Sequence, residues 1–115
     1  MNKFAEISSN KNPADIMPHS IEAEQQLLGG LLNNNDLFYS LEDKIDPEHF
    51  YDPVHSRIFD VVSNRIKDGK LASAVTVNTF LTEDEGLKEL GGSSYLAQLM
   101  AGSVASSAIK DYSKL

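Results

Sequence analysis

The stretch from Asp52 to Gly69 constrains the fold most, because it carries every signal of one amphipathic helix. Its apolar residues recur at intervals of three or four positions, which is the helical period. These residues are Val54, Ile58, Val61, Val62 and Ile66. Asp52 supplies a capping carboxylate, and Pro53 suits the first helical position. Gly69 is the residue type that most often follows a helix end. The sequence therefore predicts a helix over Pro53–Asp68.

A second apolar series with helical spacing follows Pro18 and His19. Its members are Ala23, Leu27, Leu28, Leu31 and Leu32. Ser20 is the predicted N-cap, and two glutamates in the first turn, Glu22 and Glu24, complement the helix dipole. These features predict a helix over Ile21–Asn33, which the run of asparagines from 33 to 35 ends. His19 is interpreted as a support for the helix entrance.

The middle of the chain predicts short helices joined by turns. Leu37, Leu41 and Ile45 recur every four residues, and Asn35 or Asp36 is the expected cap of that helix. The pair at 46 and 47, an aspartate and a proline, predicts a turn or a single helical turn through residue 50.

The segment 75–84 is ambiguous, because its first residues favour a strand by propensity while its apolar spacing favours a helix. We predict a helix with Ser73 as its cap, since no second convincing strand lies nearby. A helical turn over Gly86–Leu90 and a break at the glycines 91 and 92 follow. The next apolar series consists of Tyr95, Leu96, Leu99 and Met100. Ser106 or Ser107 is the expected cap of a last helix, which carries Ala108, Tyr112 and Leu115.

Together these patterns predict an all-α fold: a compact orthogonal bundle of about six short helices spanning residues 18–115. The 115 residues, 41% of them hydrophobic, suit one domain with one core. Residues 1–17 are polar and lack apolar periodicity, so a disordered tail is expected there. The last apolar series is unfinished at residue 115, which suggests a domain excised from a longer chain.

The composition excludes several classes of function. The chain contains 0 Cys, which rules out disulfides and cysteine metal sites. The net charge of −7 and the scattered basic residues disfavour unaided binding to DNA, which requires neutralised phosphates. The polar N-terminus and the lack of a long apolar run predict a cytoplasmic protein without a membrane span. The Gly69-Lys70 pair is followed by Leu71 and lacks the first glycine of a phosphate-binding loop, so no nucleotide site is expected.

Few residues are candidates for chemistry. His49, Asp52 and His55 could share a metal, but three or four converging ligands are needed and the pattern is weak. The carboxylate runs at 42–43 and 83–85 fall where helices end, and such runs are usually solvated. We predict no catalytic, cofactor-binding or metal-binding residue in this chain.

Two further features admit a structural and a functional interpretation. Gly29 and Gly30 lie within an apolar helical series, where each costs about 1 kcal/mol relative to alanine. We interpret them as a point where another helix approaches closely, and a contact with a partner is the alternative. Aromatic residues in or beside apolar series are predicted to be core; these are Phe50, Tyr51, Phe59 and Phe80. Phe38 and Tyr39 are adjacent and point to different faces, so one of them is a candidate for exposure. A plain surface position is the first interpretation of such a residue, and an anchor for a partner protein is the alternative.

Three ordered stretches resemble the N-terminal domain of DnaB-type replicative helicases. Residues 18–32, which read P-H-S-I-E-A-E-Q-Q-L-L-G-G-L-L, are similar to the family pattern P-H-x-x-E-A-E-x-x-[VL]-L-G. Residues 49–59 resemble D-F-Y-x-x-x-H-R-x-I-F, and residues 91–99 resemble G-G-x-x-Y-L-x-x-L. Ile109 and Tyr112 match the last helix of the family. The chain departs from the pattern at His49, Ser56 and Ser73, and also at Val104 and Ala108, which puts individual caps and contacts in doubt.

The resemblance implies an all-helical collar domain of a hexameric helicase that is dependent on ATP and moves 5′ to 3′. In that family a helical hairpin, a linker and a RecA-like ATPase domain follow, and the ATP, the magnesium and the DNA belong to that ATPase domain. The implied partners are further copies of the chain, primase and a helicase loader. The fragment itself is then non-catalytic and a monomer or weak dimer. Two alternatives stay open at this point: an unrelated acidic helical adaptor, and a small metalloenzyme that uses His49, Asp52 and His55.

Overall fold

Helices are the only regular secondary structure in the part of the chain that the computed structural model describes, namely the backbone of residues 20–113 and the side chains of residues 20–103. The helices are α3 (Ile21–Asn33), the 3-10 helices η1 (Asn35–Ser40) and η2 (Pro47–His49), α4 (Pro53–Lys67), α5 (Ala74–Phe80), α6 (Glu85–Leu90) and α7 (Ser93–Ser113). The predicted all-α class is confirmed. The predicted tail at 1–17, His19 and Leu115 lie outside the described residues.

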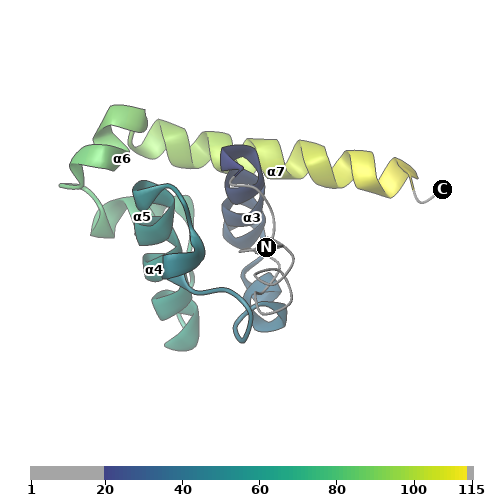
Figure 1. Cartoon of the computed structure of the whole chain (residues 1–115), viewed down its shortest axis with the longest axis horizontal. Helices are drawn as coiled ribbons and strands as arrows, with labels where there is room; N and C mark the ends of the chain where they lie inside the picture. Colours follow the sequence, from purple (N-terminus) through teal and green to yellow (C-terminus); the bar gives the residue numbers. More distant parts are fainter. Residues whose placement is uncertain (1–19, 114–115) are drawn as a thin grey trace, which may run out of the picture.

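The longest helix, α7, runs along one side of the molecule, and α3 crosses it (Figure 1). Helix α4 packs against α3, α5 and α6, and η2 lies against α4. The C-terminal part of α7 extends beyond the other helices (Figure 1). The core therefore lies where α3, α4 and the N-terminal half of α7 meet.

One apolar cluster fills this core, and it contains the series predicted from the sequence. Its buried members are Leu28, Leu31, Leu32, Phe38, Val54, Ile58, Phe59, Val62, Ile66, Ala72, Val77, Leu87, Tyr95, Leu96 and Leu99. The hydrophobic effect stabilises such a cluster by about 25 cal/mol for each Å² of apolar surface that it removes from water. The helices with the strongest apolar series thus supply most of the core.

Local hydrogen bonds explain where most of the helices begin and end. Ser20 accepts a hydrogen bond from the N–H of Ala23, and Ser73 accepts one from the N–H of Thr76, as predicted for both caps. Asp52 caps α4 through the N–H of Val54. Gly69 follows α4 with a φ of 75°, and its N–H and that of residue 70 bond carbonyls of the last turn. This pairing is the Schellman arrangement, which accounts for the predicted C-terminus.

Three predicted elements differ from the structure. The helix expected around Leu37–Ile45 is the short 3-10 helix η1, and its cap is Asn34 rather than Asn35 or Asp36. The helix expected through Asp84 ends at Phe80, and a turn follows. The two helices expected after Gly92 are one continuous helix, α7, so Ser106 and Ser107 lie inside it and not at the start of a separate helix.

Each difference has a local cause. The side chain of Asn35 bonds both the N–H and the carbonyl of Ala72 at 2.9 Å, which fixes it in a contact between segments and makes it unavailable as a cap. No proline interrupts residues 93–113, and a helix tolerates glycine at a cost of about 1 kcal/mol, so Gly102 does not stop α7.

Candidate functional site

A buried histidine joins three helices at the centre of the molecule. His55 of α4 is 0% exposed, and its Nδ1 lies 2.8 Å from Oε1 of Glu24 on α3. Its Nε2 lies 2.6 Å from the hydroxyl of Tyr95 on α7, and the two rings are stacked. Gln25 donates a hydrogen bond to the same hydroxyl at 3.1 Å. We call these four residues the histidine network.

The hydrogen bonds of the network define one consistent direction of donation. Because the Glu24 carboxylate can only accept, it pairs with the neutral tautomer of His55 that carries its proton on Nδ1, and this N–H donates a hydrogen bond to Glu24. Nε2 of that tautomer then accepts a hydrogen bond from the Tyr95 hydroxyl, which itself accepts one from Gln25. Every donor and acceptor of the buried ring is satisfied in this arrangement. A buried polar group that is fully paired in this way holds its neighbours in one geometry.

Burial raises the pKa of the Tyr95 hydroxyl, and the negative charges of Asp52 and Glu24 act in the same direction, against the hydrogen bond from Gln25. The hydroxyl therefore remains protonated, and able to donate, throughout the neutral range. Glu24 also fixes the segment that leads into α4, because it accepts hydrogen bonds from the N–H groups of Tyr51 at 2.6 Å and Asp52 at 3.3 Å. The network thus positions α3, α4 and α7 relative to one another.

The proposed metal ligands His49, Asp52 and His55 do not converge. His49 accepts a hydrogen bond from the N–H of Asp46, Asp52 caps α4, and His55 belongs to the histidine network. Among the residues that the structure describes, no group of three or more potential ligands could hold a metal ion. The geometry therefore gives the metalloenzyme hypothesis no support.

Gly69 and Lys70 also offer no free backbone N–H groups to a nucleotide phosphate. The N–H groups of both residues bond carbonyls of α4, at Ile66 and Arg65 respectively, and each distance is 2.9 Å. A phosphate-binding loop needs such groups to be free and pointing at the ligand. Gly69 and Lys70 therefore do not form a phosphate-binding loop.

Gly29 marks the closest approach of α3 to α7. A Cβ added at Gly29 would lie 2.0 Å from the carbonyl oxygen of Leu99 and 2.8 Å from Cβ of Ser103. At Gly30 the nearest atom to an added Cβ is a side-chain methyl of Leu37 at 3.2 Å. The interpretation of these glycines as a close helix contact is confirmed for Gly29. Asn33 supports the same contact by donating to the carbonyl of Met100 at 2.8 Å.

A second polar contact ties α4 to α6. Arg57 pairs with Asp84, whose carboxylate also caps α6 by accepting from the N–H of Leu87 at 3.0 Å. The hydrogen bond from Arg57 lowers the pKa of the Asp84 carboxyl below its usual range. The middle residue of the carboxylate run 83–85 is thus structural, while Glu83 and Glu85 are exposed.

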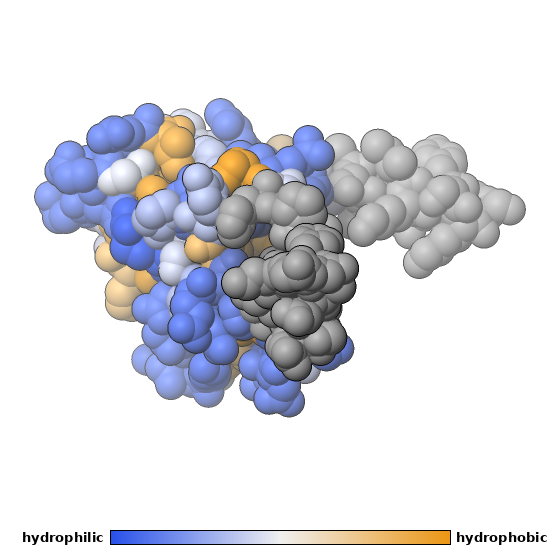
Figure 2. Space-filling view, viewed as in Figure 1, coloured by the Kyte–Doolittle hydropathy of each residue, from blue (hydrophilic) through white to orange (hydrophobic). Residues whose placement is uncertain are grey.

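The aromatic residues divide differently from the prediction. Phe59 is buried and Phe50 packs against it, with ring centroids 5.1 Å apart, as expected for core residues. Tyr51 is 61% exposed and Phe80 is 60% exposed, so their assignment to the core is wrong. Of the adjacent pair, Phe38 is buried and Tyr39 is 57% exposed. The face shown in Figure 2 is mostly hydrophilic, with small apolar areas between charged and polar residues.

Comparisons with known proteins identify the fold as one already described. Residues 16–115 match the family model described as the DnaB-like helicase N terminal domain. The chain belongs to this family. The hypothesis of an unrelated acidic adaptor is therefore wrong, and the resemblance noted from the three sequence stretches is confirmed.

The similar proteins are replicative helicases that are much longer than this DnaB-like domain. The chain is 36% identical over 100 residues to the replicative DNA helicase DnaB of Rickettsia prowazekii, covering 87% of this chain and 21% of that protein. It is 33% identical over 114 residues to the protein of the same name from Pasteurella multocida, covering 98% of this chain and 24% of that one. The chain thus spans about a fifth to a quarter of the length of these relatives.

A solved structure supports the same fold. The crystal structure of the N-terminal domain of DnaB helicase from Mycobacterium tuberculosis has a TM-score of 0.66 and 33% identity, and the match covers 73% of this chain and 58% of that one. In the described part of this DnaB-like domain, no helix is both long and apolar enough to cross a membrane.

The three sequence stretches that resemble the family meet at the histidine network. The first stretch contributes Glu24 and Gln25, the second contributes His55, and the third contributes Tyr95. Sequence reasoning missed this convergence, because 31 and 40 residues separate the bonded pairs and no local pattern links them. The only signal was that each stretch contained a polar residue at an otherwise apolar helix face.

Departures from the family pattern have local roles. His49, in place of the usual aspartate, accepts a hydrogen bond from the N–H of Asp46. Ser56, in place of the usual arginine, donates to the carbonyl of Pro47 at 2.7 Å. Ser73 caps α5 through Thr76, as an aspartate could. Val104 and Ala108 lie in α7, beyond the described side chains.

Proposed function

We propose that this domain is the assembly and protein-docking collar of a hexameric replicative DNA helicase. The family membership carries this proposal, because the relatives are named as replicative DNA helicases. In this view the domain is non-catalytic. The ATP and Mg²⁺ act in an ATPase domain elsewhere in the longer, cytoplasmic protein, and that domain engages the DNA and unwinds it at the replication fork.

The architecture is compatible with a positioning role. The histidine network and the Gly29 contact fix α7 against the rest of the domain, while the C-terminal part of α7 extends beyond it (Figure 1). A packed helical core from which one long helix projects suits a domain that sets the spacing of neighbouring subunits. Primase and a helicase loader are the proposed partners of the assembled protein.

The test uses the full-length helicase that contains this domain. Removing residues 20–113 should convert the hexamer into smaller species in sedimentation velocity and should abolish binding to the cognate primase in gel filtration. Mutation of the ATPase domain's phosphate-binding lysine is the matched control, because it should stop ATP hydrolysis and leave primase binding unchanged. A truncated protein that stays hexameric and still binds primase would refute the proposal.

The 115-residue chain alone should behave as a monomer or weak dimer, because the proposed collar uses segments beyond it. Sedimentation that shows a stable hexamer would contradict this expectation. The chain should also show no binding to duplex DNA at physiological salt, since its net charge is −7 and its basic residues are scattered along the sequence. A mobility-shift experiment checks this directly.

A further inference from the structure

Asp68 and Gly69 form the one dipeptide of the 115-residue sequence in which a glycine follows an aspartate or an asparagine. The backbone nitrogen of a residue can attack the side-chain carboxyl of a preceding aspartate, and this closes a succinimide ring. A side chain on the attacking residue hinders the reaction, whereas glycine has none. The Asp68–Gly69 dipeptide is therefore the place in this chain where such a ring forms most readily.

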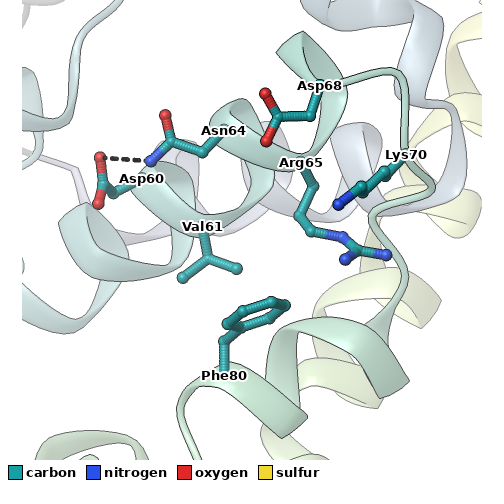
Figure 3. A pocket seen from close by; sticks show the side chains of 7 residues that line it. All are labelled: Asp60, Val61, Asn64, Arg65, Asp68, Lys70 and Phe80. Carbon is teal, nitrogen blue, oxygen red and sulfur yellow. Dashed lines mark hydrogen bonds between the residues drawn. The ribbon is translucent and has the colours of Figure 1, made fainter.

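The surroundings of this dipeptide leave room for the reaction. Asp68 and Gly69 are both exposed, and a Cβ added at Gly69 would meet no atom within 4 Å. Asp68 lies on the rim of a hollow between α4 and α5, where its carboxylate forms no hydrogen bond with the other side chains drawn (Figure 3). The salt bridges in the described part of the chain also involve other carboxylates. Water and the neighbouring backbone can thus both reach this carboxyl group.

The backbone conformation at the end of α4 opposes the attack. Ring closure requires the Gly69 nitrogen to lie beside Cβ of Asp68, because only there can it reach the carboxyl carbon. Asp68 has a ψ of 4°, so the Gly69 nitrogen instead eclipses the backbone nitrogen of Asp68. The two positions exclude each other, since Cβ and the backbone nitrogen are different substituents of one tetrahedral carbon. Asp68 must therefore rotate about its Cα–C bond before the ring can form.

Two hydrogen bonds hold Asp68 in the unreactive conformation. The N–H of Gly69 donates to the carbonyl of Ile66, and the N–H of Lys70 donates to that of Arg65, each at 2.9 Å. The attacking nitrogen is thus itself engaged, and rotation of Asp68 breaks both bonds. The ends of helices open locally at a much lower cost in free energy than the whole domain. Opening of this single turn is enough to permit the reactive geometry.

We propose that Asp68 is a site of spontaneous isomerisation to isoaspartate, and that opening of the last turn of α4 controls its rate. In the open turn the Gly69 nitrogen bonds to the side-chain carboxyl carbon of Asp68 and gives up its proton, and one water leaves. Water then adds to the ring at the backbone carbonyl carbon of Asp68, and the bond from this carbon to the Gly69 nitrogen breaks. The product is isoaspartate, with no net change in mass. The reaction consumes no oxidant, cofactor or second substrate.

Isoaspartate does not suit the end of α4. It leads the main chain through the side-chain carboxyl, which inserts one methylene between residues 68 and 69. The N–H groups of Gly69 and Lys70 then lose their register with the last turn of the helix. The hydrogen bond from Nε of Arg65 to the carbonyl of Leu71, at 3.1 Å, depends on the same segment. The modification therefore loosens the connection between α4 and α5, whatever the function of the domain.

The experiment incubates the 115-residue chain at neutral pH and body temperature for several weeks, once folded and once unfolded in guanidinium. An endoproteinase that cleaves before aspartate but not before isoaspartate then reports the conversion at residue 68, and mass spectrometry checks that the mass is unchanged. The unfolded sample should convert about tenfold faster or more, because its Asp68 rotates freely. Asp60 is the internal control; Val61 follows it, so it should not convert in either sample.

Substitutions at residue 70 test the role of the turn without altering the reacting dipeptide. Lys70→Pro removes the N–H that donates to Arg65, and it should raise the rate in the folded chain about threefold or more. Lys70→Ala is the matched control, because it keeps this N–H and should convert like the original chain. Gly69→Ala should nearly stop the conversion in the unfolded sample, since its methyl group hinders the attacking nitrogen.

Each outcome bears on a separate part of the proposal. An absence of isoaspartate at residue 68 in the unfolded sample would overturn the site itself. Equal rates in the folded and the unfolded sample would overturn the control by the turn, as would equal rates in the two variants of residue 70 when circular dichroism shows both to be folded. If Lys70→Pro does not fold, the ratio of the two rates of the original chain decides, because it needs no variant.

Discussion

Replacement of Gly29 by alanine tests whether α3 and α7 meet as closely as the structure indicates. An added Cβ would lie 2.0 Å from the carbonyl oxygen and 2.8 Å from the carbonyl carbon of Leu99, whereas ordinary contact begins at 3.4 Å. Both atoms belong to the backbone of α7, so no rotation of a side chain can relieve the clash. Helix α7 would have to move by roughly 1 Å or more, with a cost near the upper end of the usual 1–3 kcal/mol for overpacking.

The intrinsic preference of alanine for helices offsets part of this cost. Alanine is favoured over glycine inside a helix by about 1 kcal/mol. The net loss for Gly29→Ala is therefore about 2 kcal/mol in the free energy of unfolding, which corresponds to a fall in Tm of about 10 °C for a domain of this size. A shift of α7 would also disturb the packing of the core, because Leu96 and Leu99 of α7 are buried there.

The adjacent glycine is a matched control. A Cβ at Gly30 would meet only the far end of the Leu37 side chain at 3.2 Å and the Ser103 hydroxyl at 3.6 Å. Gly30→Ala should therefore be neutral or more stable by up to about 1 kcal/mol. Urea unfolding followed by circular dichroism measures both variants. If Gly29→Ala is as stable as Gly30→Ala, the close approach of α3 to α7 is refuted.

Three further perturbations address single interactions. Tyr95→Phe removes the partner of the buried Nε2 of His55 and should cost about 1–3 kcal/mol in chemical unfolding; an unchanged midpoint would show that this hydrogen bond does not stabilise the fold. Gly69→Ala should cost about 1 kcal/mol in the free energy of unfolding, because Gly69 has a φ of 75°. Gly102→Ala should be neutral or stabilising, because an added Cβ there meets no atom within 4 Å. Thermal melts that rank the two variants in reverse would refute this reasoning. Asp84→Asn should make the unfolding free energy fall less steeply with acidification below about pH 4. A carboxyl whose pKa is lower in the folded state stabilises the fold above its unfolded pKa, and it loses that contribution as the pH falls through the folded pKa. Parallel profiles of unfolding free energy against pH for the variant and the original chain would argue against the pair with Arg57.

The helix boundaries that could be predicted are those set by adjacent residues. Ser20, Ser73 and the Asp52-Pro53 pair cap helices within three residues of their own position, so the sequence alone reveals them. Gly69 ends α4 for a similarly local reason, its positive φ. Such signals act over one helical turn and depend little on the rest of the fold.

The failures occurred where distant segments decide the outcome. The side chain of Asn35 does not cap a helix, because it forms hydrogen bonds with the backbone of Ala72, which lies 37 residues away in the sequence. Phe80 has the spacing of a core residue, but α5 contains only seven residues and buries Val77 as its one fully covered apolar side chain. A periodic series identifies a helix face, whereas the neighbours that cover the face are set by tertiary packing.

The histidine network changes what the recognisable sequence stretches mean for function. Glu24, His55 and Tyr95 come from the three stretches that resemble the helicase family, and all three are engaged with one another in the interior. A partner protein cannot reach a ring that is 0% exposed without opening the core. The network residues of these stretches therefore specify the fold, and we expect any contact with a partner at exposed residues. A substitution in the network should weaken partner binding only as far as it unfolds the domain, whereas a substitution of an exposed residue that a partner contacts should weaken binding at unchanged stability.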